Sequence, residues 1–322
     1  MWKDFITLAG FSDEWVTAYV GLILASSKDE RAVRAATRSW NALRKRSRLR
    51  LKKGWGYNRW TPADADSTGL ALNLYLKIKA NNPRLYQSTI RFLKLHIQPG
   101  GGVKTFAFAK KIRMFTRLSN SYTFSGWCNT HPSVTAVLAK LPEFNSASLN
   151  YLLNEQATDG GWLSYWWVSR EYSTLLAVEA ILLSSDDRHE QSINAAIKWS
   201  SERVLQLLDQ KEIPDLFALA NALCILALKK GYSDCIDQLL TRGTQVICKH
   251  QLKDGSWSAS AKLRIPPPDV VNPDTYHNWV IEGKGGGSIL TDRNRIFTTA
   301  TLLKFLLLLP HRNKLVANDQ SN

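Results

Sequence analysis

Long apolar stretches rich in Leu and Ala dominate the pattern of hydrophobic and polar positions along this chain. The clearest of them cover residues 68–80, 172–185, 215–230 and 296–309, and each is longer than a typical strand. Stretches of this length and composition favour helices. Alternating apolar and polar positions bounded by Asn-Gly or Asp-Gly turns, which would indicate β-hairpins, are scarce. The pattern therefore predicts an all-α protein.

A short turn motif recurs between the apolar stretches. Its fullest forms are QATDGGW at 156–162 and QLKDGSW at 251–257, and QPGGG at 98–102 is a degenerate copy. The common core is a Gly-Trp or Ser-Trp dipeptide, found at Gly54-Trp55, Gly126-Trp127, Gly161-Trp162 and Ser256-Trp257. Each dipeptide precedes a threonine that opens an apolar helix, namely Thr68, Thr135, Thr174 and Thr299.

The residue types in this motif are typical of a turn between helices. Glycine permits the tight turn after one helix, and the Gln amide can bond backbone groups freed at helix ends. The Trp then packs as a wedge between neighbouring helical hairpins. Hairpins in tandem form an open solenoid or close into a ring. We expect one helical domain over residues 1–310, followed by a polar C-terminal tail over residues 311–322.

Charge narrows the class of partner. The 322 residues carry 42 Lys and Arg against 27 Asp and Glu, a formal net charge of +15, which favours an anionic partner. The densest basic run, RKRSRLRLKK at 44–53, is typical of a solvated helix face or loop, and no recognised nucleic-acid motif accompanies it. We therefore expect no nucleic-acid partner; an acidic ligand or a membrane surface fits the charge better.

The cysteines and the apolar runs favour a cytoplasmic setting. The four cysteines include no C-x-x-C pair, which disfavours disulfides and a cysteine zinc cluster. The first residues, MWKDFITLAGFSDEW, carry acids where a signal peptide would have a basic segment followed by an apolar one. The longest apolar runs are too short to span a bilayer. A cytoplasmic protein of this kind can still contact a membrane at its surface.

Two carboxylates stand at the start of the first long apolar stretch. In PADADST, at 62–68, Asp64 and Asp66 are two residues apart, and Trp55, Tyr57 and Trp60 precede them within a dozen residues. One interpretation is helix capping, because acids favour helix N-termini. The other is general acid chemistry, because burial among aromatic rings raises the pKa of a carboxyl and a neighbouring carboxylate raises it further.

The repeated Q-x-x-D-G-[GS]-W resembles the QW repeat of the squalene-cyclase and prenyltransferase superfamily, whose fold is an (α/α) barrel or toroid. PADADST is similar to the D-x-D-D acid motif of class II terpene cyclases, with Asp64 and Asp66 on its first two acids and Ser67 in place of the third. The middle acid of that motif donates the proton, and it corresponds to Asp66. The length of the chain matches the single-domain bacterial meroterpenoid cyclases, in particular those of the cyanobacterial merosterolic-acid type.

This resemblance implies a protonation-initiated cyclase that acts on the polyprenyl chain of a prenylated aromatic acid, such as a geranylgeranylated dihydroxybenzoate. It implies no cofactor and no metal. The repeat alignment of Thr68 with Thr135 places His131 opposite Asp64, so His131 is either a donor that stabilises the Asp66 carboxylate or simply the start of a helix. Aromatic side chains before the inner helices are candidates for stabilising a carbocation by cation–π attraction, namely Phe124, Trp60, Trp127, Tyr165, Trp166 and Trp167. Candidate cations for an acidic head group are Arg170, Lys284, Arg293 and Arg295.

Two other functions remain open at this level. A prenyltransferase β-like subunit would need a zinc site of Asp, Cys and His, but Cys224 lies inside an apolar stretch and no adequate Asp-x-Cys motif accompanies it. A catalytically silent toroid that binds a lipid or peptide would have lost the acid, and Asp66 is present. The long loop at 258–297, which contains IPPPDVVNP and EGKGGGS, is predicted to be a functional segment such as a lid. None of these patterns sets an oligomeric state.

Overall fold

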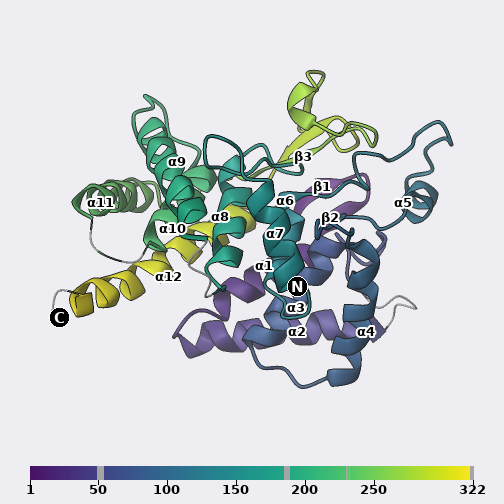
Figure 1. The fold of residues 1–322 in the computed structure, drawn as a ribbon, viewed down its shortest axis with the longest axis horizontal. Coiled ribbons are helices and arrows are strands. Elements are labelled where there is room, and N and C mark those ends of the chain that lie inside the picture. Colours follow the sequence, from purple (N-terminus) through teal and green to yellow (C-terminus); the bar gives the residue numbers. More distant parts are fainter. Residues whose placement is uncertain (49–53, 185–188, 230, 232, 320–322) are drawn as a thin grey trace.

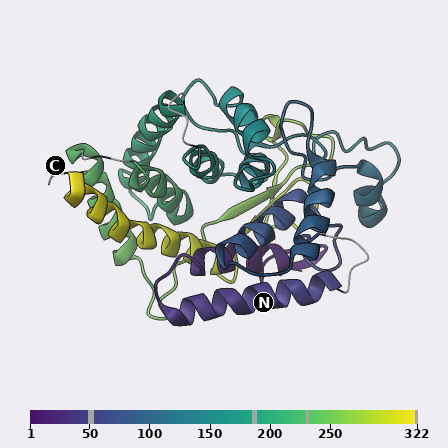
Figure 2. The same cartoon turned by 60° about the horizontal axis from the view of Figure 1, so that its bottom comes forward.

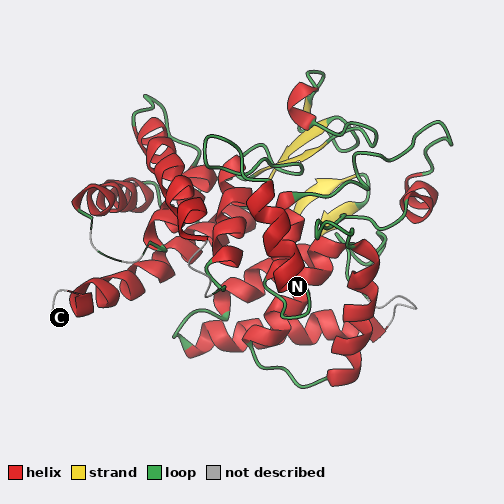
Figure 3. Ribbon diagram, viewed as in Figure 1, coloured by secondary structure: helices red, strands yellow, loops and turns green. Residues whose placement is uncertain are grey.

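The computed structural model describes residues 1–48, 54–184, 189–229, 231 and 233–319, with side chains up to residue 309. Most of this part of the chain is helical, and the short strands gather at one end of the helices (Figures 1 and 3). One set of helices is almost wholly buried: α1 (Glu14–Leu24), α3 (Ala65–Lys77), α6 (Pro132–Ala139), α8 (Arg170–Ile181) and α10 (Leu216–Ala227). α12 (Ile296–Asp319) completes this set and is buried along one side of its described part.

These buried helices form a closed inner ring. In chain order each one contacts the next, from α1 to α12, and α12 packs back against α1. Their sequences are apolar on all sides rather than along one stripe, and every residue of α10 is buried. A helix that is apolar all round must be enclosed by other helices. The predicted all-α toroid is therefore confirmed, in its closed form.

A second set of helices covers the outside of the ring: α2 (Glu30–Arg48), α4 (Pro83–Leu93), α7 (Asn145–Asn154), α9 (Glu190–Leu208) and α11 (Asp234–Lys249). Each contacts one or two inner helices; α2, for example, lies across α1 and α3 (Figure 2). In α11 the buried side chains recur at helical spacing, at Ile236, Leu239, Leu240, Gly243 and Ile247. This single apolar stripe faces the ring, and the remaining positions face solvent.

The repeated Trp joins the two layers, as the sequence predicts. Its indole N–H donates to a carbonyl near the end of the preceding outer helix, from Trp55 to Leu43, from Trp162 to Leu152 and from Trp257 to Ile247, at 2.7–2.9 Å. Its backbone N–H donates to the repeat threonine of the following inner helix. The ring of each Trp therefore lies between an outer and an inner helix and fixes their relative position.

The turn before the Trp is equally specific. Gly160 has φ +96°, and a Cβ there would lie 2.4 Å from the Ala195 carbonyl oxygen, so only glycine fits. The Gln156 amide donates to the Gly160 carbonyl at 2.8 Å and to the Ser192 carbonyl at 2.9 Å. The Gln thus closes its own turn and ties it to α9.

One repeat assignment is wrong. The Trp127 indole donates to the Pro266 carbonyl at 2.9 Å, so this ring packs on the segment 258–297 and not between hairpins. The partner of Thr135 is the backbone N–H of Val103, at 2.9 Å, immediately after QPGGG. The degenerate copy at 98–102 therefore belongs to α6, and a further copy lies at the N-terminus, where the Trp2 N–H donates to Thr17 in α1 at 2.9 Å.

The strands were not predicted. β1 (Asp4–Thr7) and β2 (Gly10–Ser12) form an antiparallel hairpin, and β3 (Lys262–Ile265), β5 (Ser288–Thr291) and β4 (Val280–Ile281) form a small mixed sheet inside the long loop. These strands are too short to show an alternating pattern. The segment 258–297 therefore contains regular secondary structure and is not a plain loop.

Two remaining segments bear on the domain limits and on the site. α12 crosses residue 310, where the sequence predicts the domain to end, and the side chains beyond residue 309 lie outside the described part, so that boundary stays a prediction. Of the basic run at 44–53, residues 44–48 end α2 and the rest lies outside the described residues. The short helix α5 (Ala109–Thr116) stands apart from the ring on an arm (Figure 1).

Candidate active site

The acid motif begins α3. Asp64 is the N-cap: one carboxylate oxygen accepts the Ser67 backbone N–H at 2.7 Å and the other accepts the Ser67 hydroxyl at 2.9 Å. Ser67, which stands where the resembling motif has a third acid, therefore holds Asp64 in place. The capping interpretation is right for Asp64, and it leaves Asp66 free of that duty.

Asp66 lies two residues further along the chain, in the first turn of α3, where burial removes it from water. Burial raises its pKa to about 8, the neighbouring Asp64 carboxylate adds to this, and the Trp15 indole acts in the opposite direction. The Asp66 side chain nevertheless keeps some accessible surface, whereas Asp64 is buried. A carboxyl that stays protonated at neutral pH and can still be reached is suited to donating a proton.

Aromatic side chains from several inner helices meet at the centre of the ring. Phe297 is central: its ring lies 4.0 Å from that of Tyr19, and 5.0 Å from those of Trp15 and Trp167, between centroids. Tyr172 packs on Trp167 at 4.7 Å, and Asp66 and Tyr172 interact electrostatically. Trp167 is thus placed among the aromatic rings that surround the acid. Trp15, Tyr172 and Phe297 were not among the sequence candidates.

A signal for the missed residues was present in the repeat. Asp66 precedes the repeat threonine of its helix by two positions. The same position is Trp15 in α1, Tyr172 in α8 and Phe297 in α12. Because the threonine fixes each helix to its turn, this position points toward the same centre in each case.

A second aromatic group lies beside the first and contains most of the other candidates. The Trp166 indole donates to the Thr105 hydroxyl at 2.8 Å. Tyr165 stacks on His131 at 4.0 Å, Trp127 lies 5.8 Å from Trp166, and Phe124 lies 5.7 Å from Trp127. The Thr105 carbonyl accepts the backbone N–H of Ala65, which connects this group to the residue before Asp66.

The structure does not place His131 as a donor to Asp66. As predicted, His131 is the N-cap residue of α6, at the repeat position of Asp64. Its Nδ1 faces the Thr105 hydroxyl at 2.9 Å and its Nε2 faces the Gly126 carbonyl at 3.1 Å, so both ring nitrogens are occupied. Burial lowers its pKa to about 3, which keeps the ring neutral. A neutral ring with Nε2–H bound to a carbonyl orders the second aromatic group instead.

Several predicted binding residues lie elsewhere. Trp60 is 68% exposed and stacks under Arg59 at 4.0 Å, so it does not line the site. Arg170 and Arg295 pair with the repeat acids Asp159 and Asp254, at 2.8 and 3.0 Å. Arg170 is the first residue of α8 and Arg295 immediately precedes α12. Each arginine therefore neutralises the acid of the repeat turn that leads to its helix. Arg293 likewise pairs with Glu282, at 3.0 Å.

The segment 258–297 walls the second aromatic group. The Tyr165 hydroxyl donates to the Val270 carbonyl at 2.8 Å, and the Phe124 backbone N–H donates to Asp269 at 2.6 Å. Arg264 is buried, donates to the Tyr165 carbonyl at 3.0 Å and pairs with Asp274 at 2.6 Å. This segment therefore fixes the loops that carry the aromatic candidates.

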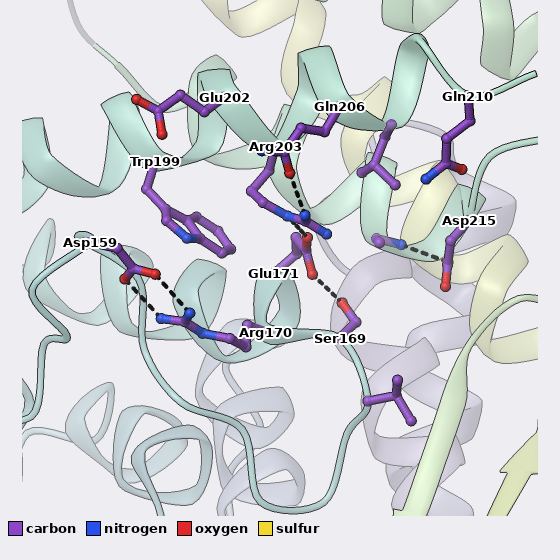
Figure 4. Close-up of a pocket in the computed structure, with 13 residues that line it drawn as sticks. Asp159, Ser169, Arg170, Glu171, Trp199, Glu202, Arg203, Gln206, Gln210 and Asp215 are labelled. Atoms are coloured by element: carbon purple, nitrogen blue, oxygen red, sulfur yellow. Dashed lines mark hydrogen bonds and ion pairs between the residues drawn. The ribbon is translucent and has the colours of Figure 1, made fainter. Parts of the chain in front are cut away.

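A polar recess of 570 Å³ lies between α8, α9 and α10, away from this group (Figure 4). Arg170 pairs with Asp159 in it, and Arg203 pairs with the buried Glu171 at 2.7 Å. Val168 faces this recess, whereas the preceding residue, Trp167, faces the ring centre. A hydrocarbon chain bound in this recess would displace water from charged side chains, which is unfavourable. We therefore do not assign the reaction to this recess.

Comparison with solved structures identifies the arrangement. The type II terpene cyclase MstE from Scytonema is 34% identical, with a TM-score of 0.90, over 97% of this chain and 93% of that one. The chain belongs to the type II terpene cyclases. A protein from Actinoplanes is 31% identical, with a TM-score of 0.87, over 96% of this chain and 93% of that one. A search of protein-family models and a search of curated proteins gave no match.

Other structures of MstE contain geranylgeranyl dihydroxybenzoate as substrate, or merosterolic acid A as product. The ent-copalyl diphosphate synthase from Streptomyces platensis shares the fold at 15% identity and a TM-score of 0.62, over 92% of this chain and 50% of that one. As a type II terpene cyclase the protein is an enzyme of the isomerase type, which starts its reaction by protonating a double bond.

Two features of the described residues bear on metal binding and on membrane insertion. Within residues 1–48, 54–184, 189–229, 231 and 233–319, no group of three or more His, Cys, Asp or Glu side chains could hold a metal ion. Over the same described part, no helix is both long and apolar enough to cross a bilayer.

The raised pKa of Asp66 predicts an effect on stability. Between the unfolded pKa near 4 and the folded pKa of about 8, folding must bind a proton or bury a charge, so Asp66 lowers stability increasingly as the pH rises. Asp66→Asn cannot ionise and should be more stable than the wild type by about 2–4 kcal/mol at pH 8, and by much less at pH 5. Thermal or urea unfolding at the two pH values measures this.

The matched control is Asp64→Ala, which removes the cap of α3 and should lower stability at pH 5 by about 0.5–2 kcal/mol. An Asp66→Asn variant that is less stable than the wild type at pH 8 would show that the carboxylate is structurally favourable, contrary to the site described here.

Proposed function

We propose that this type II terpene cyclase closes the polyprenyl chain of a prenylated aromatic acid, such as geranylgeranyl dihydroxybenzoate, with Asp66 as the proton donor. The observation that carries the proposal is the desolvated, still accessible Asp66 carboxyl, surrounded by the aromatic rings at the ring centre. The similarity to MstE, whose structures contain that substrate, supports the choice of substrate class.

The reaction needs only groups that the chain supplies. The O–H bond of Asp66 breaks, its proton adds to one carbon of the terminal double bond, and the π electrons of that bond form the new C–H bond. The cation left on the other carbon is attacked by the next double bond, so rings close in sequence. A base or water takes a proton from the last cation, which forms a double bond, and Asp66 regains a proton from solvent. The product is therefore an isomer of the substrate.

Aromatic faces stabilise such cations without reacting with them. Each ring that faces the cation contributes about 0.5–2 kcal/mol of attraction. Trp167 from the ring centre, with Trp166, Trp127, Tyr165 and Phe124 from the second aromatic group, would line the path of the chain. Closely packed rings also exclude water, which would otherwise capture the cation.

We expect Asp66→Asn to fold and to bind substrate but to lose turnover by roughly a thousandfold or more, because an amide cannot protonate an alkene. Product analysis by mass spectrometry after incubation with geranylgeranyl dihydroxybenzoate measures this. Asp64→Asn should be slower than the wild type but active, since Asp64 tunes its neighbour. In the wild type, turnover should fall as the pH rises through the Asp66 pKa of about 8.

Turnover by Asp66→Asn at near the wild-type rate would refute the acid assignment. A wild-type enzyme that leaves polyprenylated aromatic acids unchanged but cyclises another polyprenyl compound would refute the substrate class while leaving the acid in place.

We also propose that the enzyme obtains this hydrophobic substrate from an anionic membrane surface. The segment that contacts the membrane would be the arm formed by residues 106–123, which contains α5. On one face of α5 the positions 110, 111, 114 and 115 are exposed, which are Lys110, Lys111, Met114 and Phe115. Met114 is 72% and Phe108 55% exposed. Apolar side chains beside lysines match the interface of an anionic bilayer. Both ends of the arm, at Thr105 and Phe124, adjoin the second aromatic group.

Met114→Ser combined with Phe115→Ser should weaken binding to phosphatidylcholine–phosphatidylglycerol vesicles by roughly tenfold, because two buried apolar side chains are lost. Cosedimentation at several lipid concentrations gives the affinity. Leu183→Ser is the control and should bind like the wild type. It changes an apolar residue that is exposed to a similar extent as Met114 but lies just after α8, outside the arm. Failure of the wild type to bind, or equal loss in the control, would contradict the role of the arm.

A further inference from the structure

The arginines that the sequence offered for an acidic head group are already neutralised. Arg170, Arg293 and Arg295 pair with Asp159, Glu282 and Asp254, and the buried Arg264 pairs with Asp274. A carboxylate on the substrate would have to compete with these ion pairs. A cation without an acidic partner next to the aromatic path would be a better site.

Arg113 is such a cation. It lies on the inner side of α5, half-buried, with its guanidinium carbon 5.4 Å from the Phe124 ring centroid. Its Nη2 donates to the Tyr122 carbonyl at 2.6 Å, while its Nε is buried and has no hydrogen-bond partner. Among the residues with described side chains, no carboxylate lies within ion-pair distance of Arg113. The nearest acid to Phe124, Asp269, is bound by Thr123 and by the Phe124 backbone N–H.

The backbone holds Phe124 firmly under this guanidinium. Phe124 has φ +61°, a left-handed conformation that is strained for a bulky residue, and its N–H is held by Asp269 at 2.6 Å. Strain of this kind persists only where neighbours fix the residue. The arrangement therefore presents a charged donor and an aromatic face at one point.

This point lies at the far end of the aromatic path from Asp66. Ala65, next to Asp66, bonds to Thr105, and Thr105 bonds to Trp166. From Trp166 the rings continue through Trp127 to Phe124. Arg113 lies over the Phe124 ring, at the end of this series of aromatic rings. A substrate with its last double bond at Asp66 would place its aromatic head near Arg113.

We propose that Arg113 binds the carboxylate of the substrate's aromatic acid, with the head-group ring against Phe124. The proposal rests on the function proposed above. The carboxylate would supply the missing acceptor for Nε, and a guanidinium can bind both carboxylate oxygens at once. Anchoring the head in this way sets how deep the chain reaches, and so which double bond meets Asp66.

The test compares two substrates and two variants. Geranylgeranyl dihydroxybenzoate and its methyl ester differ only in the charge of the head. Arg113→Gln should lower kcat/KM for the acid by roughly ten- to a hundredfold, mainly through KM, and change that for the ester less than threefold. Arg91→Gln removes an exposed cation from the outer helix α4 and should leave the turnover of both substrates unchanged.

The outcomes separate the two proposals. If the wild type converts the acid but Arg113→Gln lowers acid and ester equally, the carboxylate site is wrong and the substrate class stands. If the wild type converts neither compound, the proposed function itself fails. Rescue of acid turnover by Arg113→Lys to part of the wild-type level would support a charge-based site.

A second inference rests on a different observation: two buried polar groups beside Asp66 make no hydrogen bond of normal geometry, and one of them, the Trp15 indole, already interacts with the Asp66 carboxyl. The Trp15 Nε1–H lies in the first turn of α1, and the Tyr172 hydroxyl lies in the first turn of α8. Both side chains are less than one-twentieth exposed. Buried donors without partners are rare and need a reason. Each flanks a carboxyl that is neutral until it gives up its proton.

The geometry points to Trp15 as the positioning residue that His131 was expected to be: its indole N–H receives the negative charge that appears on Asp66 when the proton leaves. A neutral carboxyl attracts this N–H weakly and a carboxylate attracts it strongly, so the interaction grows along the reaction. α1 packs directly against α3, which sets the two first turns side by side. The charged or titratable groups that face Asp66 are Asp64 on its own helix and Tyr172 from α8.

Replacing Trp15 with 3-benzothienylalanine exchanges the N–H for sulfur and keeps the ring shape. Loss of the donor should raise the Asp66 pKa, so the alkaline fall in turnover should move up by about one pH unit, while the plateau rate below it falls roughly tenfold. Trp167→Phe is the control: it alters the same aromatic group, and it should lower the rate without moving the pH at which turnover falls. A plateau and a pH profile both unchanged by the benzothienyl residue would overturn the role of Trp15.

Discussion

The hydrogen bond between a threonine in the first turn of an inner helix and the backbone N–H of the preceding turn is the constraint on which this site depends. It recurs from Trp2 to Thr17, Trp55 to Thr68, Val103 to Thr135, Trp162 to Thr174 and Trp257 to Thr299. It fixes both the height and the rotation of each helix. The residue two positions earlier then faces the ring centre, where one helix supplies an acid and others supply aromatic rings.

The two acids of PADADST show how one turn of helix can give two carboxyl groups different chemistry. Asp64 accepts two hydrogen bonds from Ser67, which favour its charged form. Asp66, two residues later, has lost its water without gaining comparable donors, which favours its neutral form. The carboxylate of the first raises the pKa of the second. A carboxyl that stays protonated at neutral pH is obtained here by withholding hydrogen bonds as much as by burial.

Charge and aromaticity are separated across the molecule. The repeat turns use arginine and aspartate together, so their charges cancel in the folded chain, as in Arg170 with Asp159. The centre of the ring is aromatic, and its one strongly perturbed acid is neutral near pH 7. The arm around α5, beside the end of the aromatic path, carries Lys110, Lys111, Arg113 and Arg117 and no acidic residue. This distribution suits a substrate with a neutral chain and an anionic head.

The sequence by itself determined the helices, the repeat and the position of the acid. These follow from local patterns: apolar stretches longer than strands, a Gly-Trp turn before each helix, and a carboxyl at the mouth of one of them. The toroid and the type II cyclase family were predicted from the resemblance of the repeat and of PADADST to known motifs, and both are confirmed. The shift of the third repeat from Trp127 to Val103 was missed because the degenerate copy lacks the Trp.

Only the tertiary structure decided which polar groups are available for chemistry. His131 occupies the predicted place, but Thr105 and Gly126 satisfy both its nitrogens. Trp60 is near Asp66 in sequence, yet it faces solvent. Arg113 gains its importance from a buried Nε without a partner, and Trp15 from its place beside the Asp66 carboxyl. A hydrogen bond or ion pair depends on which atoms meet within about 3 Å, and folding brings together residues whose separation in the sequence carries no record of that distance.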